Sequence, residues 1–162
     1  MSVNWIDLVL LITVVLVIWL EFRRGFGKAV FDFTAFIVAL KVSLAYGSAL
    51  GGLLRFVPDK QDNEALVFAL FFLTVGGALW LIGKLIYDAT LICIDTFDPP
   101  IGAVLGFAIA VIVGHAFMYT LFIASGAKGA VPDVITDSAL GYSFLEFPAY
   151  HAVMGFLSSL AD

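Results

Sequence analysis

Four long runs of apolar residues, separated by polar or charged stretches, constrain this chain more than any other feature. A helix needs about 20 apolar residues to cross the roughly 30 Å of hydrocarbon in a bilayer. Each run approaches or exceeds that length, and aromatic or charged residues lie at its ends. The runs cover residues 5–20, 26–54, 65–83 and 101–123. The sequence therefore predicts an all-α integral membrane protein with four transmembrane helices.

The composition agrees with lipid as the main solvent and excludes several classes of protein. Hydrophobic residues make up 62% of the 162 residues and charged residues 13%, whereas a soluble domain is about half apolar and a quarter charged. The net charge of −5 does not suit a nucleic-acid partner. The single cysteine, Cys93, forms no intramolecular disulfide, and no motif indicates a metal, a cofactor or a catalytic site. We expect the lipid bilayer as a partner and no enzymatic activity.

Two segments outside the apolar runs have a mixed character. Residues 84–97 are apolar with isolated charges, which predicts a segment running along the membrane interface after the third span. Asp98 and two prolines then suit the start of the fourth helix. Residues 129–162 combine a polar stretch with an interrupted apolar segment, which predicts an extracytoplasmic amphipathic helix. The four-span membrane domain accordingly covers residues 1–128.

Basic residues near the spans predict the orientation, because lysine and arginine are retained on the cytoplasmic side. Arg23, Arg24 and Lys28 follow the first span, and no basic residue precedes it. Arg55 and Lys60 in the next loop oppose this assignment, although three acidic residues accompany them. On balance the N- and C-termini are predicted to be extracytoplasmic.

Two spans carry stripes of small residues at four-residue spacing. Such stripes allow close backbone approach in lipid, where the hydrophobic effect contributes little to helix association. One stripe consists of Ala35, Ala39, Ser43, Gly47 and Gly51, and the other of Gly102, Gly106, Ala110 and Gly114. The pattern predicts packing of helices two and four within one chain. A homo-oligomer interface is the alternative, and both can hold on different turns.

Lys41 and His115 are ionisable residues inside the predicted spans. A charge near the membrane centre costs on the order of 3 kcal/mol, so it normally faces a cavity or a partner. Counted from the cytoplasmic ends of their spans, the two residues lie at a similar depth, and Lys41 projects from the face opposite Ala39 and Ser43. They predict a polar intramembrane site or conduction path. The alternative is a snorkelling lysine and a hydrogen-bonded structural histidine.

Two aspartates near helix ends have structural interpretations. Asp7 lies in the first turn of the first span, where an acidic side chain caps a helix, and a role in transport is the alternative. Asp32 lies just inside the predicted cytoplasmic face, close to Arg23, Arg24 and Lys28. A structural ion pair is therefore expected for Asp32.

Three short blocks of the sequence resemble the colicin V production protein (CvpA) family, in the same order and topology. The blocks consist of Trp5, Asp7, Arg24, Gly25 and Phe26, then Asp98, Gly102 and Gly106, and finally Ser138. The likeness covers about residues 4–140, and Lys41 is not part of the family pattern.

The resemblance implies a bacterial inner-membrane protein that supports colicin V production or secretion and envelope homeostasis. It supplies no defined biochemical activity. We expect a non-enzymatic scaffold or accessory homo-oligomer. The alternative is a channel or transporter for ions or small solutes, with Lys41 and His115 in its pathway.

Overall fold

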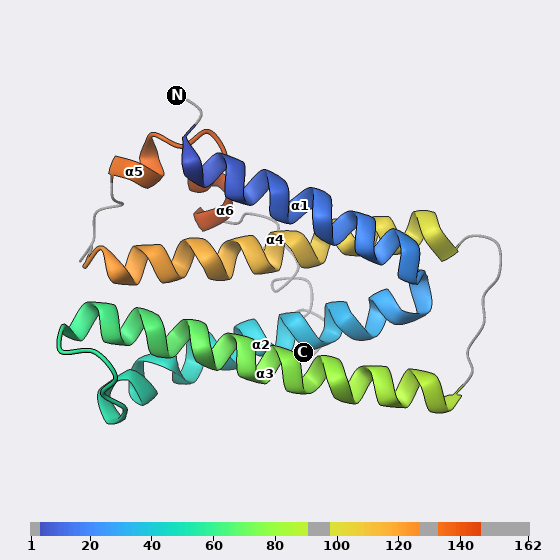
Figure 1. Cartoon of the computed structure of the whole chain (residues 1–162), viewed down its shortest axis with the longest axis horizontal. Coiled ribbons are helices and arrows are strands. Elements are labelled where there is room, and N and C mark those ends of the chain that lie inside the picture. The colour runs from blue at the N-terminus through green and yellow to red at the C-terminus, as the bar shows by residue number, and fades with distance from the viewer. Residues whose placement is uncertain (1–3, 91–97, 127–132, 147–162) are drawn as a thin grey trace, which may run out of the picture.

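Helices are the regular elements of the computed structural model, which describes residues 4–90, 98–126 and 133–146. Four long helices are followed by two short ones. Their bounds are α1 (Trp5–Arg24), α2 (Phe26–Leu53), α3 (Lys60–Thr90), α4 (Asp98–Ala124), α5 (Asp133–Thr136) and α6 (Gly141–Glu146). The four long helices are each long and apolar enough to cross a membrane. The predicted all-α membrane protein with four spans is therefore confirmed (Figure 1).

The helices extend beyond several of the apolar runs that predicted them. The third helix has 31 residues and measures about 46 Å at ~1.5 Å per residue, more than the hydrocarbon thickness of roughly 30 Å. It continues through residues 84–90, the first part of the predicted interfacial segment, without a break. Residues 91–97 of that segment lie outside the described residues, as do residues 147–162 of the predicted C-terminal amphipathic helix.

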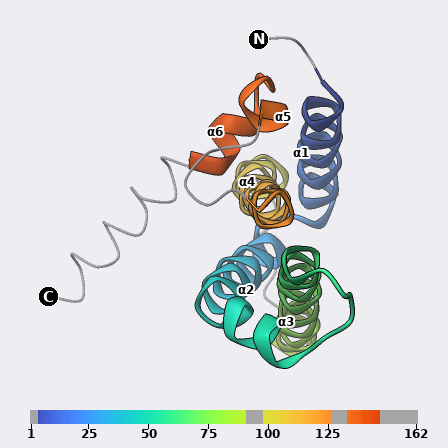
Figure 2. The same cartoon turned by 90° about the vertical axis from the view of Figure 1, so that its left-hand side faces the viewer.

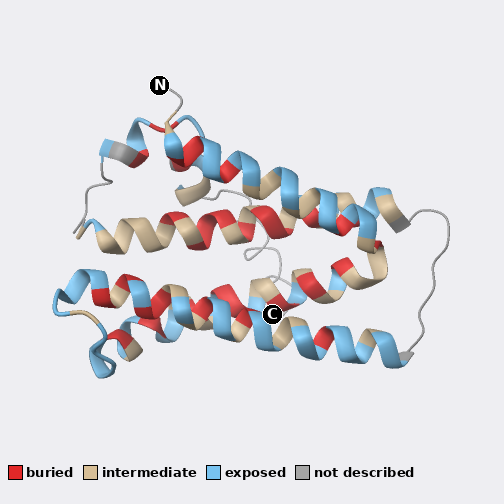
Figure 3. Ribbon diagram, in the orientation of Figure 1, coloured by how far each residue is buried: buried red, intermediate tan, exposed pale blue. Residues whose placement is uncertain are grey.

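The four long helices form two pairs with α4 at the centre. α2 packs along α3 and α1 along α4, and α4 also contacts α2 and α3. Figure 2 shows α4 between α1 and α6 on one side and the α2–α3 pair on the other. Accordingly, 50% of the most apolar stretch of α4 is buried, compared with 22% for α1. The outer faces of the bundle remain exposed and largely apolar, as lipid contact requires (Figure 3).

Two apolar clusters fill the bundle. One joins α2, α3 and α4 through Leu40, Phe68 and Ile112, among others. The other joins the start of α1 to α4 and to the C-terminal segment, with Ile6 and Met118 fully buried. Such interdigitated packing, together with hydrogen bonds between helices, provides the association energy that the hydrophobic effect does not provide in lipid.

A single residue, Gly25, makes the turn between α1 and α2. Its φ of 81° lies in the region that glycine adopts without steric cost, and its N–H donates to the carbonyl of Glu21 at 2.9 Å. The turn also lies against α4, because a Cβ on Gly102 would come within 3.3 Å of Gly25 Cα. Gly25 therefore permits both the reversal of the chain and the close approach of a third helix.

The two small-residue stripes are both used inside the chain, but each has its own partner helices. In α2, a Cβ on Gly47 would contact Phe68 of α3 at 3.0 Å, and one on Gly51 would contact Glu64 at 3.0 Å. In α4, Gly106 lies against α1, and a Cβ on Gly114 would collide with Phe144 of α6. The glycines of the two stripes therefore serve α2–α3 and α1–α4 packing. Helices α2 and α4 also pack against each other within the chain, and Ala39 of the first stripe shares a cluster with Ile112 and Ala116 of α4.

Candidate functional site

Asp7 and Asn4 form a capping box at the start of α1. The Asn4 side-chain oxygen accepts the backbone N–H of Ile6 at 2.8 Å, and the Asn4 N–H donates to Asp7 Oδ2 at 2.9 Å. A capping box satisfies N–H groups that have no partner within the helix. The predicted role of Asp7 as a helix cap is confirmed.

Asp7 also fixes the C-terminal segment to α1. Its carboxylate accepts the Ser138 hydroxyl at 2.6 Å and the Leu140 N–H at 2.8 Å, with the Ala139 N–H at 3.2 Å. The Ser138 hydroxyl in turn accepts the N–H of Gly141 at 2.8 Å. Both Asp7 and Ser138 are buried. The first and third family-like blocks, 131 residues apart in the chain, therefore meet in one contact.

At the opposite end of the bundle, three charged residues form what we call the inner polar cluster: Glu21, Arg24 and Asp32. One nitrogen of Arg24, Nη1, donates to Glu21 Oε1 at 3.1 Å and also contacts Asp32 Oδ2. Glu21 and Asp32 are both buried. The ion pair predicted for Asp32 is thus formed with Arg24, and Glu21 is a member that the sequence analysis missed.

Aromatic rings surround the basic residues at this end. The Arg24 guanidinium lies over Trp80 at 5.6 Å from the ring centroid. The ammonium of Lys28 lies over Tyr87 at 5.2 Å. Cation–π contacts of this kind are worth about 0.5–2 kcal/mol, and more as the cation is desolvated. The aromatic residues of α3 therefore connect the basic end of α1 and α2 to the third span.

The second family-like block covers the inner polar cluster from α4. A Cβ on Gly106 would lie 2.9 Å from the Cβ of Glu21, and one on Gly102 would lie 2.6 Å from the Glu21 carbonyl oxygen. No larger residue fits at either position without displacing α1. The signal that would have revealed Glu21 is its spacing, since it lies three residues before Arg24 on the helix face that the glycines contact.

Lys41 and His115 lie in different surroundings. The side chain of Lys41 is exposed on α2, between the buried residues Ala39 and Ser43, as its predicted helix face requires. His115 is buried, and its Nδ1 lies 2.9 Å from the carbonyl oxygen of Phe144 in α6. The structure thus gives His115 the interhelical hydrogen bond of the structural alternative.

A small cavity with a mixed polar and apolar lining opens between α2, α3 and α4. Its volume is about 140 Å³, and its lining includes Ser43, Ser48, Glu64 and Tyr119. The buried hydroxyl of Ser43 has no hydrogen-bond partner within the described part of the chain. Tyr119 also stacks on His115, with ring centroids 6.3 Å apart. Tyr119 therefore lines the cavity and also contacts His115, which does not itself line it.

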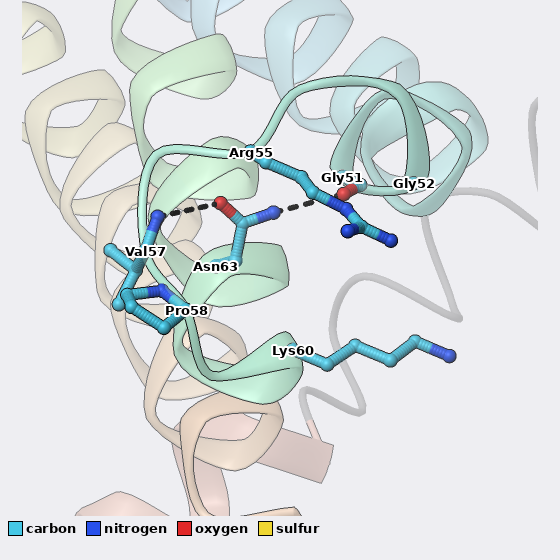
Figure 4. A pocket seen from close by; sticks show the side chains of 7 residues that line it. All are labelled: Gly51, Gly52, Arg55, Val57, Pro58, Lys60 and Asn63. Carbon is cyan, nitrogen blue, oxygen red and sulfur yellow. Dashed lines mark hydrogen bonds between the residues drawn. The ribbon is translucent and has the colours of Figure 1, made fainter.

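A second cavity, of about 420 Å³, lies at the α2–α3 connection (Figure 4). Asn63 organises it, because its amide donates to the Gly51 carbonyl at 2.9 Å and its oxygen accepts the Val57 N–H at 3.2 Å. Arg55 and Lys60 contribute the basic side chains of the lining. Asn63 is 3% exposed, so its hydrogen bonds replace those that water makes to a loop backbone.

Among the described residues, no group of three or more His, Cys, Asp or Glu side chains is arranged to hold a metal ion. The buried carboxylates instead contact donors of the same chain, at Asp7 and in the inner polar cluster. The fold and these contacts define a multi-pass helical membrane protein whose helices are joined by polar contacts at both ends.

A model of the family described as colicin V production protein matches residues 6–147, and the chain therefore belongs to that family. The resemblance noted in the sequence is confirmed over nearly the same range. No curated protein and no solved structure matches the chain.

Proposed function

We propose that this protein is a non-enzymatic scaffold or accessory subunit for the production or secretion of colicin V-type toxins and for envelope homeostasis. The observation that carries the proposal is the family match over residues 6–147 of a chain with four membrane-spanning helices. The contacts of the family-like residues support it. Asp7 and Ser138 bind each other, while Arg24 binds two carboxylates of its own chain.

The proposed location is the bacterial inner membrane, with both termini extracytoplasmic. The distribution of basic residues supports this orientation. The α1–α2 turn and the last turns of α3 lie at one end of the bundle, and the α2–α3 connection lies at the other (Figure 1). The first end carries Arg23, Arg24, Lys28 and Lys84, and the second carries Arg55 and Lys60. Lysine and arginine are retained on the cytoplasmic side, so the α1–α2 turn is assigned to that side.

The proposed assembly is a homo-oligomer formed through exposed apolar faces. The glycine stripes support packing within the chain, so a second copy needs another surface. The outer face of α1 offers one, because Leu11, Val15, Leu16 and Trp19 are each more than half exposed. Oxidative cross-linking in native membranes tests this arrangement, in a background where Cys93 is replaced by serine.

In that experiment Leu16→Cys should give a disulfide-linked dimer, since Leu16 is 51% exposed. The matched control is Val67→Cys, because Val67 is 2% exposed in the bundle and should give no dimer. The same experiment would be repeated with single cysteines at other positions along the exposed face of α1. If every such variant gives only monomer, an oligomer formed through that helix is contradicted.

Export of colicin V tests the cellular function directly. A strain that lacks its own family member should regain export when it expresses this chain. The matched control is the same chain with Gly106→Leu, which should fail because the new side chain forces α1 away from α4. Full-length wild-type protein in the membrane without restored export would overturn the proposal.

A channel or transporter is the second candidate, favoured by the cavity that Ser43, Glu64 and Tyr119 line and by the stacking of Tyr119 on His115. It predicts ion flux into proteoliposomes that Lys41→Met or Ser43→Ala reduces. If the protein is a scaffold, ion flux into proteoliposomes with the wild type should be no greater than flux into liposomes with the Gly106→Leu variant or with no protein. Flux that depends on Lys41 would therefore select the second candidate.

A further inference from the structure

The inner polar cluster contains one more acidic group than basic group. The side chains of Glu21 and Asp32 are only 6% and 3% exposed, and Arg24 is the cation that contacts both. An uncompensated charge buried at membrane depth is costly, and such groups are normally paired or neutralised. The cluster therefore requires one additional positive charge or one proton.

The arrangement of the two carboxyl groups favours a proton. Glu21 Oε2 is buried and, within the described residues, has no hydrogen-bond partner. The carboxyl groups of Glu21 and Asp32 also converge on one atom, because Arg24 Nη1 contacts both Glu21 Oε1 and Asp32 Oδ2. Two ionised carboxylates that converge in this way repel each other, whereas one shared proton converts the repulsion into a hydrogen bond.

We propose that Glu21 and Asp32 hold one proton between them and form a proton-binding site inside the membrane. The bound proton leaves one negative charge, which Arg24 neutralises through its contacts with both side chains. Gly106 and Gly102 bring the backbone of α4 against Glu21 and limit the room for water at the site.

Among the side chains that the structure describes, the other basic groups near the pair lie over aromatic rings. Lys28 of α2 lies over Tyr87, and Lys84 of α3 lies 5.9 Å from the ring centroid of Trp80. On α1, Arg23 is exposed and lies over Trp19. From α4 the pair is faced by glycine backbone. Arg24 thus remains the basic residue whose described contacts compensate the pair.

Infrared difference spectroscopy of the full chain in lipid nanodiscs tests the site. At neutral pH the wild type should show one protonated-carboxyl carbonyl band per chain, and this band should shift in D₂O. Glu21→Gln and Asp32→Asn should each abolish it, because the single remaining carboxylate pairs with Arg24 in ionised form. Asp62→Asn is the matched control, since Asp62 is exposed and its removal should leave the band unchanged.

If a variant fails to fold, a pH titration of the carbonyl band in the wild type still tests the proposal. Its band should disappear in one step as the pH is raised. Absence of the band from folded wild type, or its persistence in both variants, would overturn the proposal. So would a wild type that lacks the band and gains thermal stability from Na⁺, because a cation would then occupy the position.

Discussion

Asp7 joins two segments that lie far apart in the chain. Its carboxylate accepts the N–H of Asn4, the hydroxyl of Ser138 and the N–H groups of Ala139 and Leu140. One side chain thereby closes the first turn of α1 and attaches the segment that follows α4. Asp7 and Ser138 are both buried. If one of them is removed, the polar atoms of the other lose a hydrogen-bond partner that water cannot replace.

Ser138→Ala should therefore destabilise the fold by about 1–3 kcal/mol, the usual cost of a buried polar group left unsatisfied. Thermal unfolding in nanodiscs measures the effect. Ser125→Ala is the control, because the Ser125 hydroxyl bonds a backbone carbonyl at an exposed position and its loss should change little. Equal melting temperatures for Ser138→Ala and the wild type would show that the contact contributes nothing.

Arg24→Gln should be more damaging than the neighbouring Arg23→Gln. Removing one partner of a buried ion pair costs about 3–5 kcal/mol, because the other charge stays buried. Arg23 is exposed and lies over Trp19, so its loss removes an exposed cation–π contact of about 0.5–1 kcal/mol. Urea or thermal unfolding of both variants gives the comparison, and similar losses for the two would refute a special role for Arg24.

At the scale of the element, the small residues determine which helices touch. Gly102 and Gly106 allow α1 to approach α4 closely, while Gly47 and Gly51 allow the close approach of α3 to α2. The four-residue spacing predicted close packing within the chain but did not specify which helix each glycine contacts. Periodicity along one helix defines a face and says nothing about which other helix lies against it.

Gly106→Ala should separate α1 from α4 and destabilise the bundle by about 1–3 kcal/mol, as overpacking does. The contacts that resist it are a Cβ and a backbone atom of α1, at 2.9 Å and 3.1 Å, and neither is the end of a flexible side chain. Gly77→Ala is the matched control. Apart from the nearby backbone of α3 itself, no described atom lies within 4 Å of the added methyl, and alanine favours a helix by about 1 kcal/mol over glycine. The two variants should therefore shift the melting temperature in opposite directions, and shifts of the same sign would contradict this packing.

For the whole molecule, the sequence was sufficient to predict the number of spans, because runs of apolar residues at membrane length admit little else. The cap at Asp7 and the ion pair of Asp32 also followed from local spacing. The contact of Asp7 with Ser138 did not, since nothing in either segment encodes their proximity across 131 positions. Glu21 was missed for a related reason, because its burial depends on Gly106 of another helix.

The central claim is that the family-like residues act by stabilising the packing of the helices in a scaffold. The most direct test is the amount of colicin V exported per molecule of folded protein. Asp7→Asn, Arg24→Gln and Gly106→Ala would be expressed in a strain without its own family member, with folded protein in the membrane counted for each. We predict that export falls in proportion to the amount of folded protein, so the ratio stays at the wild-type value. Loss of export by fully folded Asp7→Asn or Arg24→Gln protein would contradict the claim and assign those side chains a direct part in the activity.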